Sequence, residues 1–410
     1  PEVPPELAIT LRSYQIDGFH FLSYLAVNRF GGILADDMGL GKTVQTITWV
    51  LWLRNSWEGT PPPTIVVCPK SVLDVWAIEF RKAAPVVRVQ VLHDKDELDM
   101  SQLVNGIDVL VLNYAQLRST IDSLKNVTFL AAILDEGQQI KNPDSKAARA
   151  AREVNAHNRL VLTGTPMENR LLDLWSLMAF ATPGALGDRA YFTKHFDRRK
   201  DERASQRLSA RLRPFILRRT KSQVAKELPP RTEENMLCEM SGVQEQMYRD
   251  ELANAQNMVL TAVGKDALQR RRFALLQALT RLRQICCHPG LANAEAMGEE
   301  SAKLTAAMDL IEQLHEEGHK VLFFSQFVSM LKIVRSKLEE MNLPYHWLTG
   351  ASTDRASIVK AFQEDENASV FLLSLKAGGS GLNLPVWTYS AQTPTNEAIM
   401  PTGVGMTVPA

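Results

Sequence analysis

The sequence predicts an α/β protein with two units, each built on a parallel sheet, together with helical insertions. Short apolar runs rich in Val, Ile and Leu alternate with helix-like segments, which is typical of parallel strands covered on both faces. This pattern gives way to a helical texture after Leu171 and restarts after Lys303. A length of 410 residues also exceeds what one ordinary core accommodates.

Each unit has its own series of expected elements. The first has strands at 65–68, 109–112, 133–134 and 160–162, and helices at 43–54, 71–80 and 146–154. The second follows the order helix 304–317, strand 320–324, helix 327–341, strand 345–348, helix 355–362 and strand 369–373.

The region between the units, from Leu171 to about Ala292, is mostly helical in pattern. Residues 232–240 are expected to return to the first sheet as a further strand. Residues 188–221 carry twelve Lys or Arg against four Asp or Glu, with Arg198, Arg199 and Lys200 in succession. Such a run is either a solvated helix face or a basic surface that faces a phosphate backbone, and the sequence leaves both interpretations open.

The composition of the whole chain narrows the classes of partner and compartment. Lys+Arg and Asp+Glu are equal at 46 each, so the net charge gives no indication of nucleic acid. No apolar run reaches the length of a membrane span, so no membrane partner is expected. Cys286-Cys287-His288 is interpreted as core packing rather than a zinc site, because no second ligand pair accompanies it. The chain begins at Pro1 without a signal pattern, and we expect a piece of a protein that is cytoplasmic and nucleoid-associated in a bacterium, or nuclear in a eukaryote.

The segment from Gly31 to Thr43 predicts a site for nucleotide phosphates. An apolar strand runs into a glycine-containing loop that opens a helix, and its glycines let backbone N–H groups approach phosphate oxygens. Lys42 is expected to reach the β- and γ-phosphates, and the Thr43 hydroxyl to bind Mg²⁺. Asp36 stands where the general pattern has a glycine. The predicted ATP-binding residues of this loop are Asp37, Met38, Gly39, Leu40, Gly41, Lys42 and Thr43.

An acidic pair, Asp135-Glu136, ends one of the apolar strands. Asp135 is expected to hold Mg²⁺ through water, and Glu136 to orient and deprotonate the attacking water. Most Asp-Glu pairs are solvated surface carboxylates. The position of this pair after a buried strand, downstream of a phosphate loop, favours a catalytic role alongside Lys42.

The ordered motifs resemble the Swi/Snf remodelling and translocase branch of helicase superfamily two, over residues 7 to about 384. The sequence Asp-Glu-Gly-Gln at 135–138 is more similar to bacterial and archaeal members. In chain order the matching segments are 11–15, 36–43, 68–71, 135–138, 162–166, 214–221, 227–230, 282–289, 323–327, 348–355 and 374–384.

The resemblance implies two RecA-like P-loop lobes with ATP between them, and helical insertions that grip DNA. It implies lobe 1 at 1–240 with a helical insertion at about 171–230, and a helical insertion or linker at 241–300. A partial lobe 2 is expected at 301–384 and a divergent tail at 385–410.

The resemblance also implies roles for individual residues. The Gln15 amide would pair with adenine and so favour ATP over GTP. Thr163, Gly164 and Thr165 would couple the hydrolysis site to the lobe interface. Seven further residues, each of which could also be an ordinary polar surface residue, fall where the family contacts the DNA backbone: Lys70, Ser71, Asn113, Tyr114, Ser325, Gln326 and Lys376.

These inferences favour an ATP-dependent translocase on double-stranded DNA, with ATP and Mg²⁺ as cofactors and a DNA-bound protein as cargo. A strand-separating helicase has the same chemistry with a different mechanical output, by family analogy the less favoured one. A P-loop kinase or metabolic transferase would not need the second unit.

A nucleotide-binding interaction protein with impaired catalysis is the remaining alternative. In the family, the segment that corresponds to 374–384 is followed by motif VI, whose arginines reach the γ-phosphate. No Lys or Arg occurs here from Val386 to Ala410. We therefore expect a truncated second lobe and weak hydrolysis.

Overall fold

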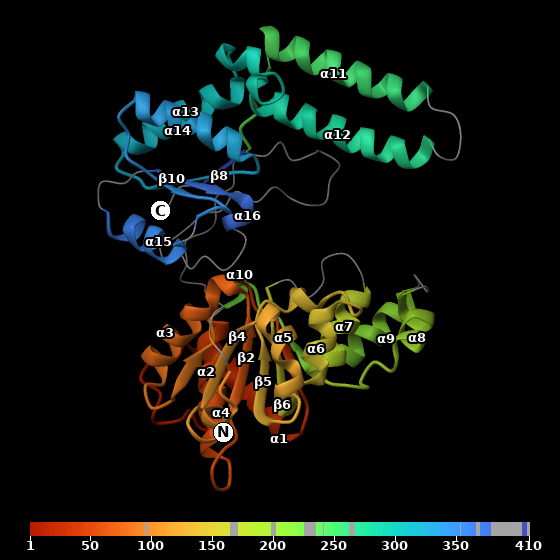
Figure 1. Cartoon of the computed structure of the whole chain (residues 1–410), viewed down its shortest axis with the longest axis vertical. Coiled ribbons are helices and arrows are strands. Elements are labelled where there is room, and N and C mark those ends of the chain that lie inside the picture. Colours follow the sequence, from red (N-terminus) through yellow and green to blue (C-terminus); the bar gives the residue numbers. More distant parts are fainter. Residues whose placement is uncertain are drawn as a thin grey trace. The chain divides into compact units, whose positions relative to one another are not determined.

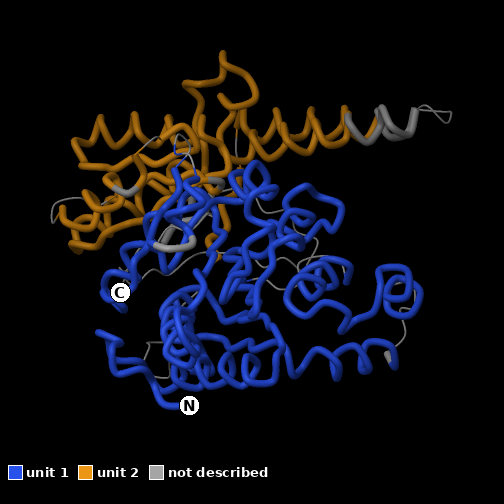
Figure 2. Tube along the Cα trace, turned by 60° about the horizontal axis from the view of Figure 1, so that its bottom comes forward, with its two compact units in different colours: residues 1–229 blue, residues 230–410 orange. Residues whose placement is uncertain are grey.

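The first of two units comprises residues Pro1–Pro229 (Figure 2). Parallel strands form its sheet (Figure 1). The computed structural model describes the chain except for residues 94–95, 97, 165–170, 198–201, 225–234, 241, 262–266, 353, 366–369, 379–403 and 408–410. Within the described part, seven strands hydrogen-bond in the order β3-β4-β2-β5-β6-β1-β7, and every pair is parallel. They are β1 (Gly32–Leu34), β2 (Thr64–Cys68), β3 (Val89–Val91), β4 (Val109–Asn113), β5 (Thr128–Leu134), β6 (Asn155–Leu162) and β7 (Ile216–Leu217).

Helices cover both faces of this sheet, because successive strand side chains point to opposite sides. Ile33 and Leu34 of β1, for example, enter two different hydrophobic clusters. The cluster with Leu34 includes side chains of α1 (Ser13–Val27), α2 (Lys42–Asn55) and α3 (Leu73–Ala83). The cluster with Ile33 includes side chains of α5 (Tyr114–Leu124), α6 (Lys146–Glu153) and α7 (Leu171–Ala181). The short helices η1 (Lys70–Val72), α4 (Met100–Asn105) and η2 (Gly137–Ile140) complete the connections.

A helical excursion follows α7 and ends in β7, which pairs with β1. It contains α8 (Arg189–Phe192), η3 (Thr193–Asp197), α9 (Glu202–Leu212) and η4 (Arg213–Phe215), and α10 (Lys221–Val224) follows β7. We expected a further strand at 232–240. Over the described part of this segment, residues 235–240, the prediction is wrong, because these residues are not in a strand. The strand that returns to the first sheet is β7, some twenty residues earlier in the chain.

The second unit, Pro230–Ala410, begins with two long helices that pack side by side (Figure 1). These are α11 (Gly242–Thr261) and α12 (Ala267–Cys287), followed by η5 (Pro289–Leu291) and η6 (Ala294–Gly298). A second sheet then has the order β11-β8-β10-β9, in which β11 alone runs antiparallel to its neighbour among the described strands. Its elements are α13 (Ala302–Glu316), β8 (Val321–Ser325), α14 (Val328–Glu340), β9 (Tyr345–Leu348), α15 (Arg355–Glu364), β10 (Val370–Ser374), α16 (Leu375–Gly378) and β11 (Val404–Thr407).

The predicted α/β class is thus confirmed, with two separate sheets. The strand at 345–348 has the predicted bounds, while β5 and β6 begin several residues earlier than expected. The predicted tail lies largely outside the described residues, so the expectation of an incomplete second lobe stays a prediction. No helix in the described ranges is both long and apolar enough to cross a bilayer.

Candidate active site

The phosphate loop lies between β1 and α2, at the carboxyl edge of the first sheet. Gly39 and Gly41 have φ angles of +86° and +74°, a backbone region that strains residues with a side chain. A Cβ atom at Gly41 would also lie only 2.4 Å from Nε2 of Gln15. Both glycines are therefore required by this loop, which leads into the N-terminus of the 14-residue helix α2. Backbone N–H groups at such a terminus favour bound anions.

Lys42, at the start of α2, turns its ammonium group back into the loop. Its Nζ donates to the backbone carbonyls of Asp36 at 2.6 Å and Asp37 at 3.2 Å. Burial lowers the pKa of Lys42, and the negative charges of Glu136 and Asp135 oppose that shift. The sequence-predicted loop lysine and acidic pair are therefore electrostatic neighbours.

Asp135 ends β5 with its carboxylate held by two donors. Oδ2 accepts from the Trp76 indole at 2.9 Å, and Oδ1 accepts from the backbone N–H of Glu136 at 2.9 Å. Burial raises the pKa of Asp135 to about 6; the Trp76 hydrogen bond opposes this shift, and the charge of Glu136 adds to it. The hydroxyl of Tyr114 donates to the Asp135 carbonyl at 2.7 Å and so fixes the backbone as well.

A chain of side-chain hydrogen bonds leads from Glu136 to the end of β6. Gln138 Nε2 donates to Glu136 Oε2 at 2.7 Å, and the Thr163 hydroxyl donates to Gln138 Oε1 at 3.2 Å. Glu136 itself has a φ of +51°, which is uncommon for a residue with a side chain. A Cβ at Gly164 would lie 3.2 Å from Met38, so the end of β6 approaches the phosphate loop. Thr165 lies outside the described residues.

Gln15 lies against the phosphate loop from the first turn of α1. Its Oε1 accepts from the backbone N–H of Arg12 at 2.9 Å, and its Nε2 donates to the Leu40 carbonyl at 3.4 Å. Its role in reading adenine stays a prediction.

From the sequence we did not identify the residues whose side chains bind and orient the carboxylates of this site. Asp36 is fully buried and forms an ion pair with Arg219, which belongs to the segment after β7. Trp76 and Gln138 were likewise not singled out as partners of the acidic pair. Asp36 itself was the sequence signal that could have predicted such a partner. A carboxylate at a glycine position of a buried loop requires a cationic partner.

The seven residues predicted to contact DNA have different surroundings. Asn113 and Tyr114 are buried; Asn113 caps α5 by accepting from two backbone N–H groups. Ser325 is buried and accepts from the backbone N–H of Phe327 at 3.2 Å. Lys70, Ser71 and Gln326 are exposed, and the Gln326 side-chain oxygen accepts from the Arg283 guanidinium. Lys376 lies in α16.

The basic run forms a surface of the helical excursion, with residues 198–200 outside the described part. Along α9, Arg203, Arg207 and Arg211 are exposed at successive four-residue intervals, while Ala204 and Leu208 pack into the core.

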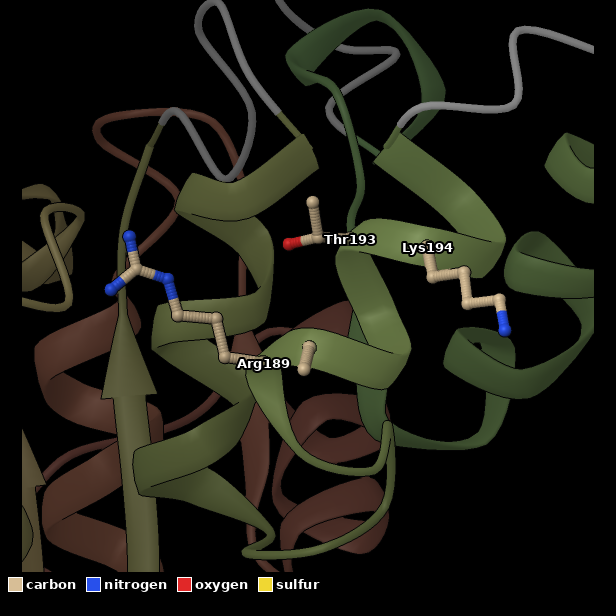
Figure 3. Close-up of a pocket in the computed structure, with 4 residues that line it drawn as sticks. Arg189, Thr193 and Lys194 are labelled. Atoms are coloured by element: carbon tan, nitrogen blue, oxygen red, sulfur yellow. The ribbon is translucent and has the colours of Figure 1, made fainter.

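A hollow of about 450 Å³ lies beside this run, lined by Arg189, Ala190, Thr193 and Lys194. Figure 3 shows the Arg189 and Lys194 side chains extending away from one another. Nη1 of Arg189 lies 2.7 Å from Oδ1 of Asp144, so the positive charge of Arg189 is partly compensated.

Oxygen ligands for Mg²⁺ are present at the phosphate site, whereas the cysteines offer no metal centre. The Asp135 carboxylate and the Thr43 hydroxyl are the hard donors that Mg²⁺ prefers, and each Asp135 oxygen retains a lone pair after its protein hydrogen bond. Cys287 and His288 are buried, and His288 Nδ1 accepts from the backbone N–H of Gly290 at 3.0 Å. Within the described ranges no three His, Cys, Asp or Glu side chains form a group that could hold a metal.

Comparison with known proteins gives matches along both units. Residues 14–291 match the SNF2-related domain, and residues 302–394 match the Helicase conserved C-terminal domain. An ATP-dependent helicase of Mycoplasma pneumoniae is 36% identical over 381 residues, covering 92% of this chain and 36% of the relative. The ISWI chromatin-remodeling complex ATPase ISW2 of Saccharomyces cerevisiae is 36% identical over 401 residues, covering 91% of this chain and 35% of the relative.

Among solved structures, the Sulfolobus solfataricus SWI2/SNF2 ATPase core in complex with dsDNA is similar, with a TM-score of 0.53 and 36% identity. The match covers 90% of this chain and 79% of that chain. The chain spans little more than a third of the length of the two curated relatives.

Proposed function

The chain belongs to the family of ATP-dependent helicases with an SNF2-related domain, and we propose that it is an ATP-driven motor that translocates along double-stranded DNA. The observation that carries the proposal is the assembly of Lys42, Asp135 and Glu136 around one phosphate loop. Such a constellation suits hydrolysis of a nucleoside triphosphate rather than binding alone.

The chemistry divides among these three residues. The Lys42 ammonium would donate to the β- and γ-phosphates, whose charged oxygens are stronger acceptors than the carbonyls that it contacts here. Asp135 and Thr43 would hold Mg²⁺, which would neutralise phosphate charge. Glu136 would accept the proton of the attacking water, and Gln138 orients its carboxylate.

Coupling to the mechanical step would use the hydrogen bonds that leave Glu136. Thr163 contacts Gln138, so a change at the hydrolysis site has a direct route to the end of β6. Gln15 would select adenine, because its amide offers both a donor and an acceptor.

Double-stranded DNA is proposed as the track because the Sulfolobus solfataricus relative is described in complex with dsDNA. The exposed arginines of α9, Arg203, Arg207 and Arg211, would add a cationic surface that contacts phosphates without reading sequence. Lys70, Ser71, Gln326 and Lys376 would contribute further backbone contacts. Asn113, Tyr114 and Ser325 would support neighbouring backbone, given their burial.

An ATPase assay with no nucleic acid, single-stranded DNA and duplex DNA in parallel tests the proposal. Stimulation by duplex DNA, without strand separation in a companion unwinding assay, is the expected result. Unwinding of a forked duplex would favour the strand-separating alternative. Turnover that depends on a small-molecule phosphate acceptor would overturn the motor assignment.

A second candidate, a nucleotide-binding protein with impaired catalysis, rests on the absence of Lys and Arg between Val386 and Ala410. The same assay distinguishes it, since nucleotide would then bind tightly while turnover stays slow at every DNA concentration. Arginines that reach a transferring phosphoryl group contribute roughly 10³–10⁵ in rate.

A protein bound to DNA is proposed as the cargo, because one relative is named as a chromatin-remodeling ATPase. The corresponding location would be the nucleoid of a bacterial cytoplasm, or the nucleus of a eukaryote.

A further inference from the structure

The first half of the phosphate loop is paired with residues 217–221, which we call the return segment. The parallel pairing of β1 with β7 continues beyond the strands, because Ala35 N donates to the Leu217 carbonyl at 2.7 Å and Asp37 N to the Arg219 carbonyl at 3.0 Å. The Lys221 backbone N–H also donates to Asp37 Oδ2 at 3.1 Å. The first half of the loop is thus held by residues that lie more than 180 positions later.

The strongest of these contacts is the ion pair between Arg219 and Asp36. The guanidinium engages both carboxylate oxygens, with Nε 3.0 Å from Oδ1 and Nη2 bonded to Oδ2. The Arg219 backbone N–H donates to Oδ1 as well, at 3.1 Å. Asp36 is fully buried and Arg219 is nearly so, and a fork of this kind satisfies a carboxylate that would otherwise be costly to bury.

Arg219 also reaches the start of α1. Its Nη1 donates to the Tyr14 carbonyl, and the guanidinium lies 5.6 Å from the centre of the Tyr14 ring. Its Nη2 donates to Gln45 Oε1 at 2.9 Å, on α2. One side chain therefore joins the phosphate loop, the helix that follows the loop, and the residue that precedes Gln15.

We propose that Arg219 is a positioning residue of the nucleotide site, which fixes the phosphate loop through Asp36 and the approach of Gln15 through Tyr14. This explains the aspartate at the glycine position of the loop: the carboxylate receives the return segment. The inference rests on the proposed function, because it concerns the geometry in which ATP is bound. The Arg219 guanidinium is committed to Asp36, Tyr14 and Gln45, so its effect should fall on binding.

The deciding variant is the double substitution D36N/R219M, which removes both charges and keeps similar side-chain volumes. The single variant R219M would leave a buried unpaired carboxylate and lose stability for that reason alone. R219K retains the charge but not the fork, and so gives a second, better-folding probe.

The matched control is R54M/D108N. It removes another largely buried ion pair of the first unit, in which Arg54 Nη2 lies 2.8 Å from Asp108 Oδ1, a carboxylate that the exposed Arg88 also engages. Arg54 lies about 18 Å beyond Lys42 along the same helix. The control therefore reports the effect of losing an ion pair without a contact to the loop.

The measurements are the dissociation constant of a fluorescent ATP analogue with Mg²⁺, the melting temperature, and kcat and KM for ATP. We expect D36N/R219M to weaken binding at least tenfold and to raise KM with kcat within about threefold of the parent, while R54M/D108N binds like the parent. R219K should lie between them.

A folded D36N/R219M that binds within twofold of the parent would overturn the inference. If D36N/R219M does not fold, the ATP affinity of R219K tests the inference instead. Binding by R219K as tight as that of the parent would then overturn the inference. A fall in kcat at unchanged KM would also contradict a positioning role. A parent protein that binds no ATP would instead refute the proposed function.

Discussion

The indole nitrogen of Trp76 donates a hydrogen bond of 2.9 Å to Oδ2 of Asp135. Trp76 is 1% exposed and belongs to α3, so the bond is rigid and shielded from water. Since Oδ1 accepts from the Glu136 backbone, the plane of the carboxylate is fixed from both sides. A carboxylate oriented in this way can present its remaining lone pairs to a cation or to its water.

The burial of Asp135 predicts a pH-dependent stability. Its pKa is raised to about 6 in the folded protein, against an ordinary value of 3.8, so the folded state binds a proton more tightly than the unfolded state. Asp135 therefore contributes stability at low pH that is lost as the pH rises through about 6. Relative to D135N, the parent should lose about 2 kcal/mol in unfolding free energy between pH 4.5 and pH 8.

Denaturant unfolding in EDTA at the two pH values measures this change, since bound cations would mask it. The side-chain amide in D135N has only one acceptor oxygen and so loses one of the two hydrogen bonds of the carboxylate, and this loss offsets both values and cancels in the comparison. Equal differences at pH 4.5 and pH 8 would show that Asp135 titrates normally.

Replacing Lys42 by Ala should weaken Mg-ATP binding by about 10- to 100-fold, because charge-assisted hydrogen bonds to phosphate are lost. Titration with a fluorescent ATP analogue measures the loss. K82A is the control, since Lys82 pairs with Glu79 at 3.7 Å on the exposed surface of α3 and should not affect binding. Parental affinity in K42A would mean that the loop does not hold the phosphates.

Replacing Glu136 by Gln should preserve ATP binding and lower kcat by roughly 10²–10⁴, because an amide cannot accept the proton of the attacking water. The amide oxygen can still accept from Gln138, so the local geometry is retained. Single-turnover hydrolysis and nucleotide titration, run on the same preparation, separate the two effects. Turnover close to that of the parent would remove Glu136 from the chemistry.

Charge reversal of Arg203, Arg207 and Arg211 tests the basic surface of α9. If all three face phosphates, the slope of log affinity against log salt should become shallower by about 2 to 3. Affinity should fall similarly for duplexes of different sequence. Reversal of Lys332, an exposed residue of α14, provides the control. An unchanged salt slope in the triple variant would leave the run as a solvated helix face.

Local patterns predicted most of the first sheet, and the predicted residues Lys42, Asp135 and Glu136 do lie near one another at the phosphate loop. Short strands such as β2 and β4 are recognisable because nearly all of their residues are apolar and both of their faces are buried, and the phosphate loop is recognisable from its spacing. β5 was predicted too short although residues 129–132 are apolar and buried, and two of them are alanines, which are depleted in strands. The two-residue strand β7 carries no periodic signal at all.

The supports of the site were harder to predict because they come from distant segments. Arg219 belongs to the basic run 188–221, which the sequence left open as a solvated face or a DNA-facing surface, yet its guanidinium is committed to Asp36. Trp76 follows the ordinary apolar spacing of an amphipathic helix, and only its indole N–H distinguishes it from a core residue. Partners separated by 59 and 183 residues leave no trace in local composition.

The place of β1 in its sheet determines when the phosphate loop can acquire its folded surroundings during synthesis. β1 is synthesised before both of its hydrogen-bonded neighbours, which are β6, beginning at Asn155, and β7, beginning at Ile216. At translation rates of about 5–20 residues per second, roughly ten seconds or more separate the emergence of β1 from that of β7. During that interval β6 becomes available to β1 before β7 does, and the phosphate loop lacks Arg219 throughout. A nascent chain should therefore acquire nucleotide binding in one late step, after the return segment has left the ribosome.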